Sequence, residues 1–273
     1  DKSKWTGGRL SSRSFEYGWI DHGAPYFSAD SPEFETFLQR QLPADSLHHW
    51  RAKLSGELRA DERVRLVGVP RNSAITRGLL GGICFQPSTR IARLAECAEG
   101  WKLFNDGDSL LGSWSAVVLA VPAPQAQALL RDLPSLLNPV STVRMEPCWV
   151  AAIRSNASLP EQADIAVYEH PVVRRIVNNS AKSGRNNADI CVVQASKEWS
   201  ERYLEESPQW IAQQLQENFS QMVSASTSEL LFVHRWRYAF TEQALGRPSV
   251  WESRLRLGVC GDWCLGRGGE GGW

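Results

Sequence analysis

The segment Ser115–Val121 (SAVVLAV) is the feature that most restricts the folds open to this chain. It is an apolar run that stops at Pro122, which is typical of a strand buried on both faces of a helix-covered parallel sheet. A helix is expected directly after it, at Pro124–Leu130, and a second buried strand is expected at Leu255–Gly261. The sequence therefore predicts an α/β fold, with parallel α/β units towards both ends of the chain.

The region between these units has a different pattern. Several strand-like segments follow one another with few helices, which favours a mostly antiparallel sheet and hence a second domain. The expected strands are 148–154, 165–168, 172–177, 190–195 and 230–238, with one long helix at 208–223. Nearer the start, we expect helices at 32–42 and 73–80, a strand at 63–69, a helix or strand–helix junction at 88–97, and a hairpin that turns at 105–107.

Length and composition exclude several classes of protein. With 273 residues, 42% of them apolar and 22% charged, the chain is expected to fold into one large or two medium domains. Thirty basic residues balance thirty acidic ones, which argues against a strongly basic binder of nucleic acid or of membranes. No apolar run approaches the roughly 18–20 residues that span a bilayer, and the polar start does not resemble a secretory signal. We expect a cytoplasmic protein.

The cysteines and tryptophans carry weaker signals. Of six cysteines only Cys260 and Cys264 are close in sequence, and no second pair completes a zinc site. The cysteines are therefore expected to be buried or incidental thiols, and no metal is predicted. Twelve tryptophans are unusually many; most are expected in the core, and several could line a flat aromatic ligand.

Two polar, glycine-containing clusters near the start could bind a nucleotide. Asp1 is followed by a Gly7-Gly8-Arg9 loop, in which the glycines let the backbone approach a phosphate and Arg9 adds charged donors. The segment Asp21–Ala24 (DHGA) has small residues against which a flat group could lie. Each cluster alone is also compatible with an ordinary surface loop or turn.

The third cluster follows the apolar strand LRLGVC. Gly261-Asp262 is succeeded by a glycine-dense stretch that ends at Trp273. A strand, a Gly-Asp pair and a presumptive helix start could together hold a phosphate or the pyrimidine edge of a flavin. The simpler reading is a turn with a capping aspartate.

Together the three clusters resemble the renalase-like proteins of the flavin-containing amine oxidase superfamily. The resemblance rests on DKSKWTGGRLSSR with DHGAPYFS, on LVGVPRNSAI, SAVVLAVPAPQA and HRWRYA, and on the final CGDWCLGRGGEGGW. It implies an FAD-dependent oxidoreductase with a doubly wound, Rossmann-like FAD-binding domain and a mixed or antiparallel substrate domain. The expected bounds are 1–35, 63–122 and 250–273 for the first domain, and 36–62 and 123–249 for the second.

The resemblance also implies roles for single residues. In this sequence Asp1 corresponds to the ribose-binding acid, and Ile91 to a position whose backbone faces adenine. The remaining residues that correspond to FAD contacts are Gly7, Gly8 and Arg9 at the pyrophosphate, Gly23 and Ala24 beside the isoalloxazine ring, Gly261 and Asp262 at the ribityl-pyrophosphate region, and Glu270, Gly271 and Gly272 at the pyrimidine. The implied arrangement has Arg9 and Asp262 gripping one dinucleotide from opposite sides.

Several departures from the family pattern put FAD binding in doubt. The phosphate-binding GxGxxG fingerprint normally precedes the acidic residue by about 20 residues. It is not in the sequence, so the first strand and helix, roughly 30 residues, are expected to be missing, together with a helix after Trp273. Pro25 stands where relatives usually have Gln, and Arg71-Asn72 where Gly-Met is usual. The chain is therefore expected to be truncated at both ends.

The resemblance further implies that a small-molecule substrate loses a hydride to flavin N5, with oxygen as the final acceptor. Strand alternation in HRWRYA puts His234 and Trp236 on one face and Arg235 and Arg237 on the other. If the first face lines a pocket, Trp236 could stack on the substrate and His234 could orient it or move a proton. The second face could hold a substrate phosphate or be solvated.

The substrate and the activity have alternatives. Renalase-like relatives oxidise isomers of reduced nicotinamide dinucleotides, whereas the older name of the group points to amines. The chain could instead be a non-catalytic flavin- or nucleotide-binding remnant. A nicotinamide-dependent dehydrogenase is a third alternative, against which the final Gly-Asp-Trp loop argues. The sequence does not indicate the oligomeric state.

Overall fold

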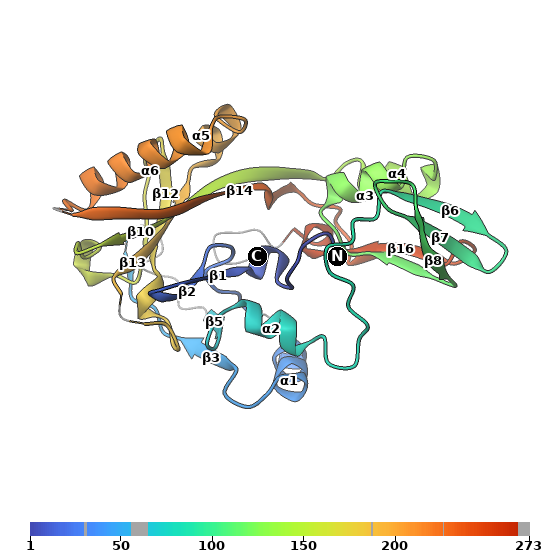
Figure 1. Cartoon of the computed structure of the whole chain (residues 1–273), viewed down its shortest axis with the longest axis horizontal. Coiled ribbons are helices and arrows are strands. Elements are labelled where there is room, and N and C mark those ends of the chain that lie inside the picture. Colours follow the sequence, from blue (N-terminus) through green and yellow to red (C-terminus); the bar gives the residue numbers. More distant parts are fainter. Residues whose placement is uncertain (30–31, 56–64, 187, 226, 267–273) are drawn as a thin grey trace. The chain divides into compact units, whose positions relative to one another are not determined.

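The described residues of the computed structural model are 1–29, 32–55, 65–186, 188–225 and 227–266. They divide into two compact units (Figure 1). Unit 1 comprises 1–6, 84–146 and 240–266, and unit 2 comprises 7–83 and 147–239. The functional division into an FAD domain and a substrate domain follows other bounds and stays a prediction.

Unit 2 is built on a large sheet, which confirms the mostly antiparallel sheet expected from the sequence. Its strand order is β14-β10-β13-β12-β11-β4, and every recorded pairing is antiparallel except that of β11 with β4. The strands are β4 (Leu54–Ser55), β10 (Arg144–Ser155), β11 (Ile165–Val167), β12 (Val173–Asn178), β13 (Ile190–Ala195) and β14 (Ser228–Gln243).

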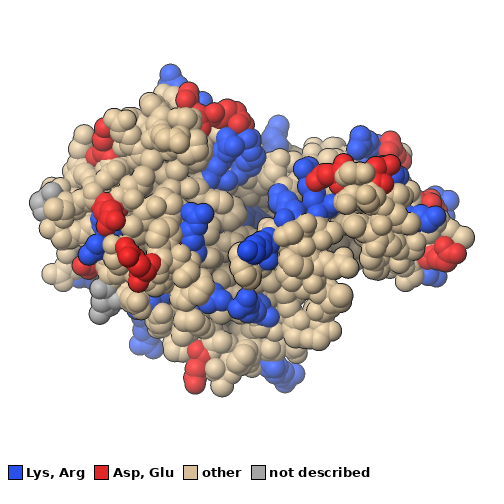
Figure 2. Space-filling model, in the orientation of Figure 1, with Lys and Arg blue, Asp and Glu red and all other residues tan. Residues whose placement is uncertain are grey.

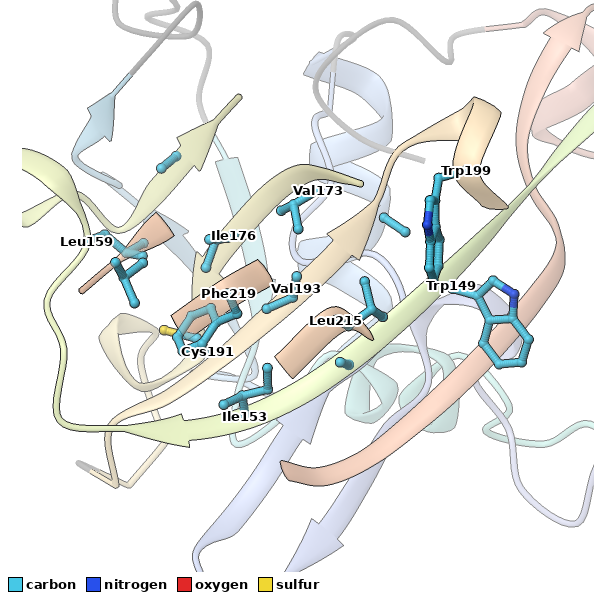
Figure 3. Close-up of a cluster of buried hydrophobic side chains, with 14 of the residues drawn as sticks. Trp149, Ile153, Leu159, Val173, Ile176, Cys191, Val193, Trp199, Leu215 and Phe219 are labelled. Atoms are coloured by element: carbon cyan, nitrogen blue, oxygen red, sulfur yellow. The ribbon is translucent and has the colours of Figure 1, made fainter. Parts of the chain in front are cut away.

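Two helices cover one face of this sheet, α5 (Lys197–Arg202) and α6 (Pro208–Met222). Helix α6 begins where the Ser207 side chain accepts a hydrogen bond from the Trp210 amide, with Pro208 in the first turn. Its apolar residues recur every four positions and enter a buried cluster with the inward side chains of β10, β12 and β13. Figure 3 shows Leu215 and Phe219 against Ile153 and Val193. The long helix predicted at 208–223 is thus confirmed.

The opposite side of unit 2 contains the segments from the start of the chain. They are the hairpin β1 (Ser12–Phe15) and β2 (Gly18–Asp21), helix α1 (Pro32–Gln41), the antiparallel pair β3 (Leu47–Trp50) and β5 (Arg65–Gly68), and helix α2 (Ser73–Gly78). Tyr26 and Trp50 pack there against Ile165 and Val177 of the large sheet. The helices expected at 32–42 and 73–80 and the strand at 63–69 are therefore confirmed within the described residues.

Unit 1 contains the parallel pair that the two apolar runs predicted. Strand β9 (Val117–Leu119) pairs in parallel with β16 (Leu257–Cys260), which pairs antiparallel with β15 (Ser249–Glu252). Helices α3 (Ala123–Leu129) and α4 (Pro134–Val140) bury their apolar residues with Leu119, Leu257 and Val259. A parallel pair between segments so distant in sequence is what a discontinuous domain requires.

Two details of unit 1 contradict the sequence-based expectations. Val118 is 57% exposed, so burial of this strand on both faces is wrong. The segment expected as a helix or strand–helix junction at 88–97 ends instead in strand β6 (Arg93–Cys97). Strand β6 belongs to a meander with β7 (Gly100–Phe104) and β8 (Leu110–Trp114), which includes the predicted hairpin. Residues 93–97 pair in antiparallel register with 100–104, and none of the five is fully buried, so this segment is a partly exposed strand and not a helix.

The described residues also bear on membranes, metals and charge. No helix among them combines the length and apolar composition needed to cross a membrane. Within these same ranges, no group of three or more His, Cys, Asp or Glu could hold a metal ion. All six cysteines are free thiols. Figure 2 shows Lys and Arg side chains spread over the face in view, with Asp and Glu among them.

Candidate functional site

The glycine loop at the start of unit 2 forms a tight turn before β1. The Leu10 amide donates to the Gly7 carbonyl at 2.7 Å, and the Ser11 hydroxyl donates to the Gly8 carbonyl at 2.6 Å. Gly8 has a φ of 49°, and no described atom lies within 4 Å of where its Cβ would be. A phosphate could therefore approach this backbone closely. Arg9 is anchored nearby, because its Nη1 donates to the Ala239 carbonyl of β14 at 3.2 Å.

The structure brings this loop together with the second predicted segment. The Ala24 amide donates to the Arg9 carbonyl at 2.7 Å. A Cβ on Gly23 would overlap the same carbonyl oxygen, so only glycine fits there. Ala24 itself is fully buried. Gly23 is thus required by a close approach between two parts of the chain, and the proximity of Gly23 and Ala24 to an isoalloxazine ring stays a prediction.

A buried ionic network holds the segment from the other side, and the sequence analysis did not identify it. The Asp21 carboxylate accepts hydrogen bonds from the Lys182 ammonium at 2.8 Å and from the Arg185 guanidinium. All three side chains are fully buried. The other carboxylate oxygen of Asp21 accepts hydrogen bonds from the backbone amide of Asn72 at 3.0 Å and from the Ser12 hydroxyl at 2.7 Å.

The same network binds the backbone that follows Asp21. Lys182 Nζ donates to the Pro25 carbonyl at 3.2 Å. Asn72 Nδ2 donates to the Ala24 carbonyl at 2.9 Å and to the Pro25 carbonyl at 3.1 Å. Asn72 is one of the two residues at which the sequence departs from the Gly-Met of the renalase-like pattern, and here its side chain satisfies buried backbone groups.

The electrostatics of the network favour ionised partners. Burial would raise the pKa of Asp21, but Lys182 and Arg185 outweigh it and lower that pKa to about 2. Burial lowers the pKa of Lys182 to about 8, against the opposing attraction of Asp21. At neutral pH the network therefore contains one carboxylate and two cations.

The residue after Asp21 lies in a cluster of rings. The His22 ring is 4.9 Å from the His234 ring and 5.6 Å from the Trp236 ring, and the last two are 4.3 Å apart, all between centroids. Trp236 Nε1 donates to the His22 carbonyl at 2.9 Å. The predicted pairing of His234 and Trp236 on one face of β14 is confirmed.

Both imidazoles are neutral at pH 7. Burial, followed by the proximity of His234 and Arg13, lowers the pKa of His22 to about 3. Burial and Arg13 lower the pKa of His234 to about 4. His22 is 8% exposed, and its buried Nδ1 atom has no hydrogen-bond partner among the residues that the structure describes. Because native structures rarely leave such an atom unsatisfied, this atom is a candidate contact for a ligand.

Sequence reasoning treated His22 as part of a turn and so missed it as a site residue. The signal was its position between Asp21 and Gly23, but nothing local in sequence connects it to β14. On the other face of β14, Arg235 and Arg237 both bind the Glu205 carboxylate. That face is therefore a solvent-exposed surface whose charged groups form ion pairs, in agreement with the solvated alternative.

The residues expected at the adenosine end lie in unit 1, and two of their segments are adjacent. The Thr89 amide donates to the Asp1 carbonyl at 2.7 Å, and the Ser88 amide donates to the Ser3 carbonyl at 3.0 Å. The Asp1 carboxylate accepts from the Ser3 amide at 2.7 Å. An open polar hollow of about 410 Å³ lies beside them, lined by Lys2, Ser88, Thr89, Arg90, Asn105, Asp106, Gly107 and Leu111. Asp1 and Ile91 thus belong to neighbouring segments.

The remaining predicted contacts lie at the end of β16. A Cβ on Gly261 would be 2.6 Å from Trp263 Nε1, which itself donates to the Val121 carbonyl at 3.0 Å. Asp262 is exposed. Glu270, Gly271 and Gly272 lie outside the described residues. Arg9 belongs to unit 2 and Asp262 to unit 1, so their contact with one dinucleotide stays a prediction.

Comparison with solved structures shows three similar oxidoreductases. A double mutant of putrescine oxidase with redesigned cofactor binding has a TM-score of 0.64 and 12% identity, covering 98% of this chain and 88% of that one. An oxidoreductase from Methanosarcina mazei has a TM-score of 0.56 and 12% identity, with 76% and 52% covered. A putative protoporphyrinogen oxidase from Exiguobacterium sp. 255-15 has a TM-score of 0.53 and 14% identity, with 73% and 48% covered.

The chain shares the fold of these oxidoreductases. The α/β fold class expected from the sequence is thereby confirmed. The matched part of the chain spans about half the length of the Methanosarcina and Exiguobacterium proteins. No protein-family model matches the sequence.

Proposed function

We propose that this chain is an FAD-dependent oxidoreductase of the renalase-like type, which oxidises a small molecule by hydride transfer. The observation that carries the proposal is the joining of the Gly7–Arg9 loop to the Gly23–Ala24 backbone, beside the buried imidazole of His22 and the half-buried imidazole of His234, both neutral at pH 7. The shared fold with three oxidoreductases supports it.

The donor set fits a dinucleotide. Gly8 has open space above its backbone, and Arg9 carries a positive charge next to it. In the proposal Gly7, Gly8 and Arg9 hold the pyrophosphate, and Gly23 and Ala24 border the isoalloxazine ring. In unit 1, Asp1 and Ile91 bind the adenosine, and Gly261 and Asp262 contact the ribityl-pyrophosphate part. The proposed pyrimidine contacts are Glu270, Gly271 and Gly272.

The chemistry that bound FAD would supply is acceptance of a hydride at flavin N5, with oxygen as the final acceptor. In this proposal the chain's own residues position the substrate and accept a proton. Trp236 offers a flat surface for a substrate ring, and its indole N–H fixes the His22 carbonyl. A neutral His234 can accept a hydrogen bond or a proton at its unprotonated ring nitrogen, because its pKa of about 4 leaves it uncharged at pH 7.

The charges near the imidazoles favour a dihydronicotinamide dinucleotide isomer over an amine as substrate. The Arg13 guanidinium lies 4.7 Å from the centroid of the Phe232 ring, which is itself 5.5 Å from the His22 ring centroid. Its positive charge accordingly lowers the pKa of both His22 and His234. The carboxylate that acts on His22 is Asp21, which Lys182 and Arg185 already neutralise. A protonated amine would be repelled there, whereas a phosphate-bearing dinucleotide would be attracted.

The test is the visible spectrum of the purified chain mixed with FAD. We expect absorbance of bound oxidised flavin that bleaches anaerobically with a dihydronicotinamide dinucleotide isomer and not with a primary amine. Bleaching by the amine alone would overturn the substrate class. Bound flavin that neither compound reduces would favour the non-catalytic flavin-binding alternative, and failure to bind FAD would overturn the proposal.

Arg13→Gln gives a matched test of the substrate argument. It should slow reduction by the dinucleotide on the order of tenfold, the effect of losing about 1.4 kcal/mol of attraction. Arg235→Gln is the control, because Arg235 lies on the other face of β14 and binds Glu205. Equal effects of the two changes would argue against an anion-binding role for Arg13.

A further inference from the structure

Burying the network of Asp21, Lys182 and Arg185 costs desolvation free energy, and the network's net contribution to the stability of the fold does not explain why this cost is met. The three side chains are fully buried, and two of them are cations. A buried ion pair commonly gains little net stability over apolar packing, because desolvation offsets the attraction. A second buried cation adds a further desolvation penalty. The cluster therefore needs another explanation for its presence at this position.

Its hydrogen bonds converge on one short segment. Lys182 binds the Asp21 carboxylate and the Pro25 carbonyl, which bracket His22, Gly23 and Ala24. Lys182 directly follows the turn Asn179–Ala181 after β12, and the Asn179 side chain accepts from the Asp21 amide at 3.1 Å. Side chains in the connection between β12 and β13 thus hold both ends of the backbone from Asp21 to Pro25, which is four peptide bonds long.

The bracketed segment is the part of the chain that carries the candidate site. The His22 carbonyl accepts from Trp236, and the Ala24 amide donates to the glycine loop at Arg9. The network holds the segment from one side, and these two bonds hold it from the other. A shift at Asp21 would therefore move the His22 ring and the Arg9 carbonyl together.

We propose that Lys182 is a positioning residue, which holds the His22–Ala24 segment in its site geometry through Asp21 and the Pro25 carbonyl. Its effect on ligand binding rests on the proposed function, whereas its effect on the segment does not. Replacing Lys182 by Met keeps an unbranched chain of similar length and leaves Asp21 paired with Arg185. The fold is therefore expected to survive while the anchor at Pro25 is lost.

Amide hydrogen exchange of the whole chain tests the proposal without any ligand. In Lys182→Met the amides of Asp21 and Ala24 should exchange on the order of tenfold faster, because two bonds to a charged group are lost. The amides of β13 should keep their rates. Val193→Ala is the control, since it creates a cavity in the buried cluster of the same unit without touching the network. It should speed exchange throughout the large sheet.

Two results would overturn the positioning role. One is unchanged exchange at Asp21 and Ala24 in Lys182→Met. The other is a uniform rise across the unit that matches Val193→Ala. The ring resonances of His22 provide a second reading, and they should move in Lys182→Met and remain in place in Val193→Ala.

An FAD titration connects the role to ligand binding. The FAD dissociation constant should rise about tenfold in Lys182→Met and remain near the wild-type value in Val193→Ala. Wild-type protein that binds no FAD would overturn the proposed function, while the exchange rates would still decide the positioning role. Equal FAD affinity in the two variants, with FAD bound by wild type, would contradict the link between Lys182 and the site.

Discussion

The indole nitrogen of Trp236 donates a hydrogen bond to the carbonyl oxygen of His22 at 2.9 Å, although 214 positions separate the two residues. The same pair is in ring contact, with centroids 5.6 Å apart and planes inclined by 23°. A strand of the large sheet and a loop near the start of the chain are thus joined by both a polar and an aromatic contact. The predictions below concern the consequences of this junction and of its support.

Trp236→Phe keeps an aromatic ring and removes the donor. We expect a loss of about 1 kcal/mol in the free energy of unfolding, typical of one hydrogen bond to a buried carbonyl. Anaerobic reduction of bound flavin should slow more than FAD affinity falls, because Trp236 is proposed to face substrate. Trp210→Phe in α6 is the control for indole loss. A variant that loses FAD affinity and keeps its reduction rate would exclude Trp236 from the substrate site.

Gly23→Ala and Gly8→Ala separate packing from ligand binding. A Cβ at Gly23 would overlap the Arg9 carbonyl, so chemical denaturation should show a loss of about 1–3 kcal/mol. A Cβ at Gly8 meets no described atom, and its φ of 49° should limit the loss to about 1–2 kcal/mol. FAD affinity should fall further in Gly8→Ala than its stability loss accounts for. If Gly23→Ala weakened FAD binding more than Gly8→Ala did, the result would argue against the pyrophosphate role of Gly8.

Asp21→Asn removes the one carboxylate between two buried cations. Leaving a buried charge without its partner typically costs about 3–5 kcal/mol, and thermal unfolding should show a loss of that order. The double change Asp21→Asn with Lys182→Met removes one cation as well and should recover part of the loss. A double variant less stable than Asp21→Asn alone would contradict charge imbalance as the cause.

We expect the protein to lose stability in mild acid, because the pKa values of His22 and His234 are lowered in the folded chain. The pKa of His22 falls from 6.5 to about 3 and that of His234 to about 4, so between these values and 6.5 the unfolded chain binds more protons. Stability should therefore decline as pH falls through this window. Denaturation of His22→Gln from pH 7 to pH 4 should show a shallower decline, since that group no longer titrates. A decline as steep as that of wild type would show that His22 does not contribute.

Sequence patterns predicted those helices and strands that are determined by residues close to one another in the sequence. The four-residue spacing of Ile211, Leu215 and Phe219 and the Ser207-Pro208 start determine α6. Strand alternation placed His234 and Trp236 on one face. The continuity of the two apolar runs predicted strands of a parallel sheet, but the predicted burial of the first strand on both faces is wrong at Val118, because exposure depends on what covers the sheet.

The ionic network could not be predicted in this way. Asp21 ends strand β2, Asn72 precedes helix α2 and Lys182 follows the turn after β12, and no spacing in the sequence relates them. Each is an ordinary polar residue until the fold brings them within hydrogen-bond distance. His22 could not be predicted as a site residue for the same reason, since its burial results from contacts with β14. The adenosine-side and pyrimidine-side assignments depend on the resemblance and stay predictions.

One face of β14 carries aromatic rings and the other carries guanidinium groups. The register of β14 against β10 therefore determines which of these line the candidate site. His234 and Trp236 face the start of the chain, whereas Arg235 and Arg237 face Glu205. Inserting one residue just upstream of His234 would invert the strand, exchanging rings for guanidinium groups on the site side. Such a frame-preserving insertion would convert an uncharged, aromatic wall into a strongly cationic one, although every original amino acid would still be present.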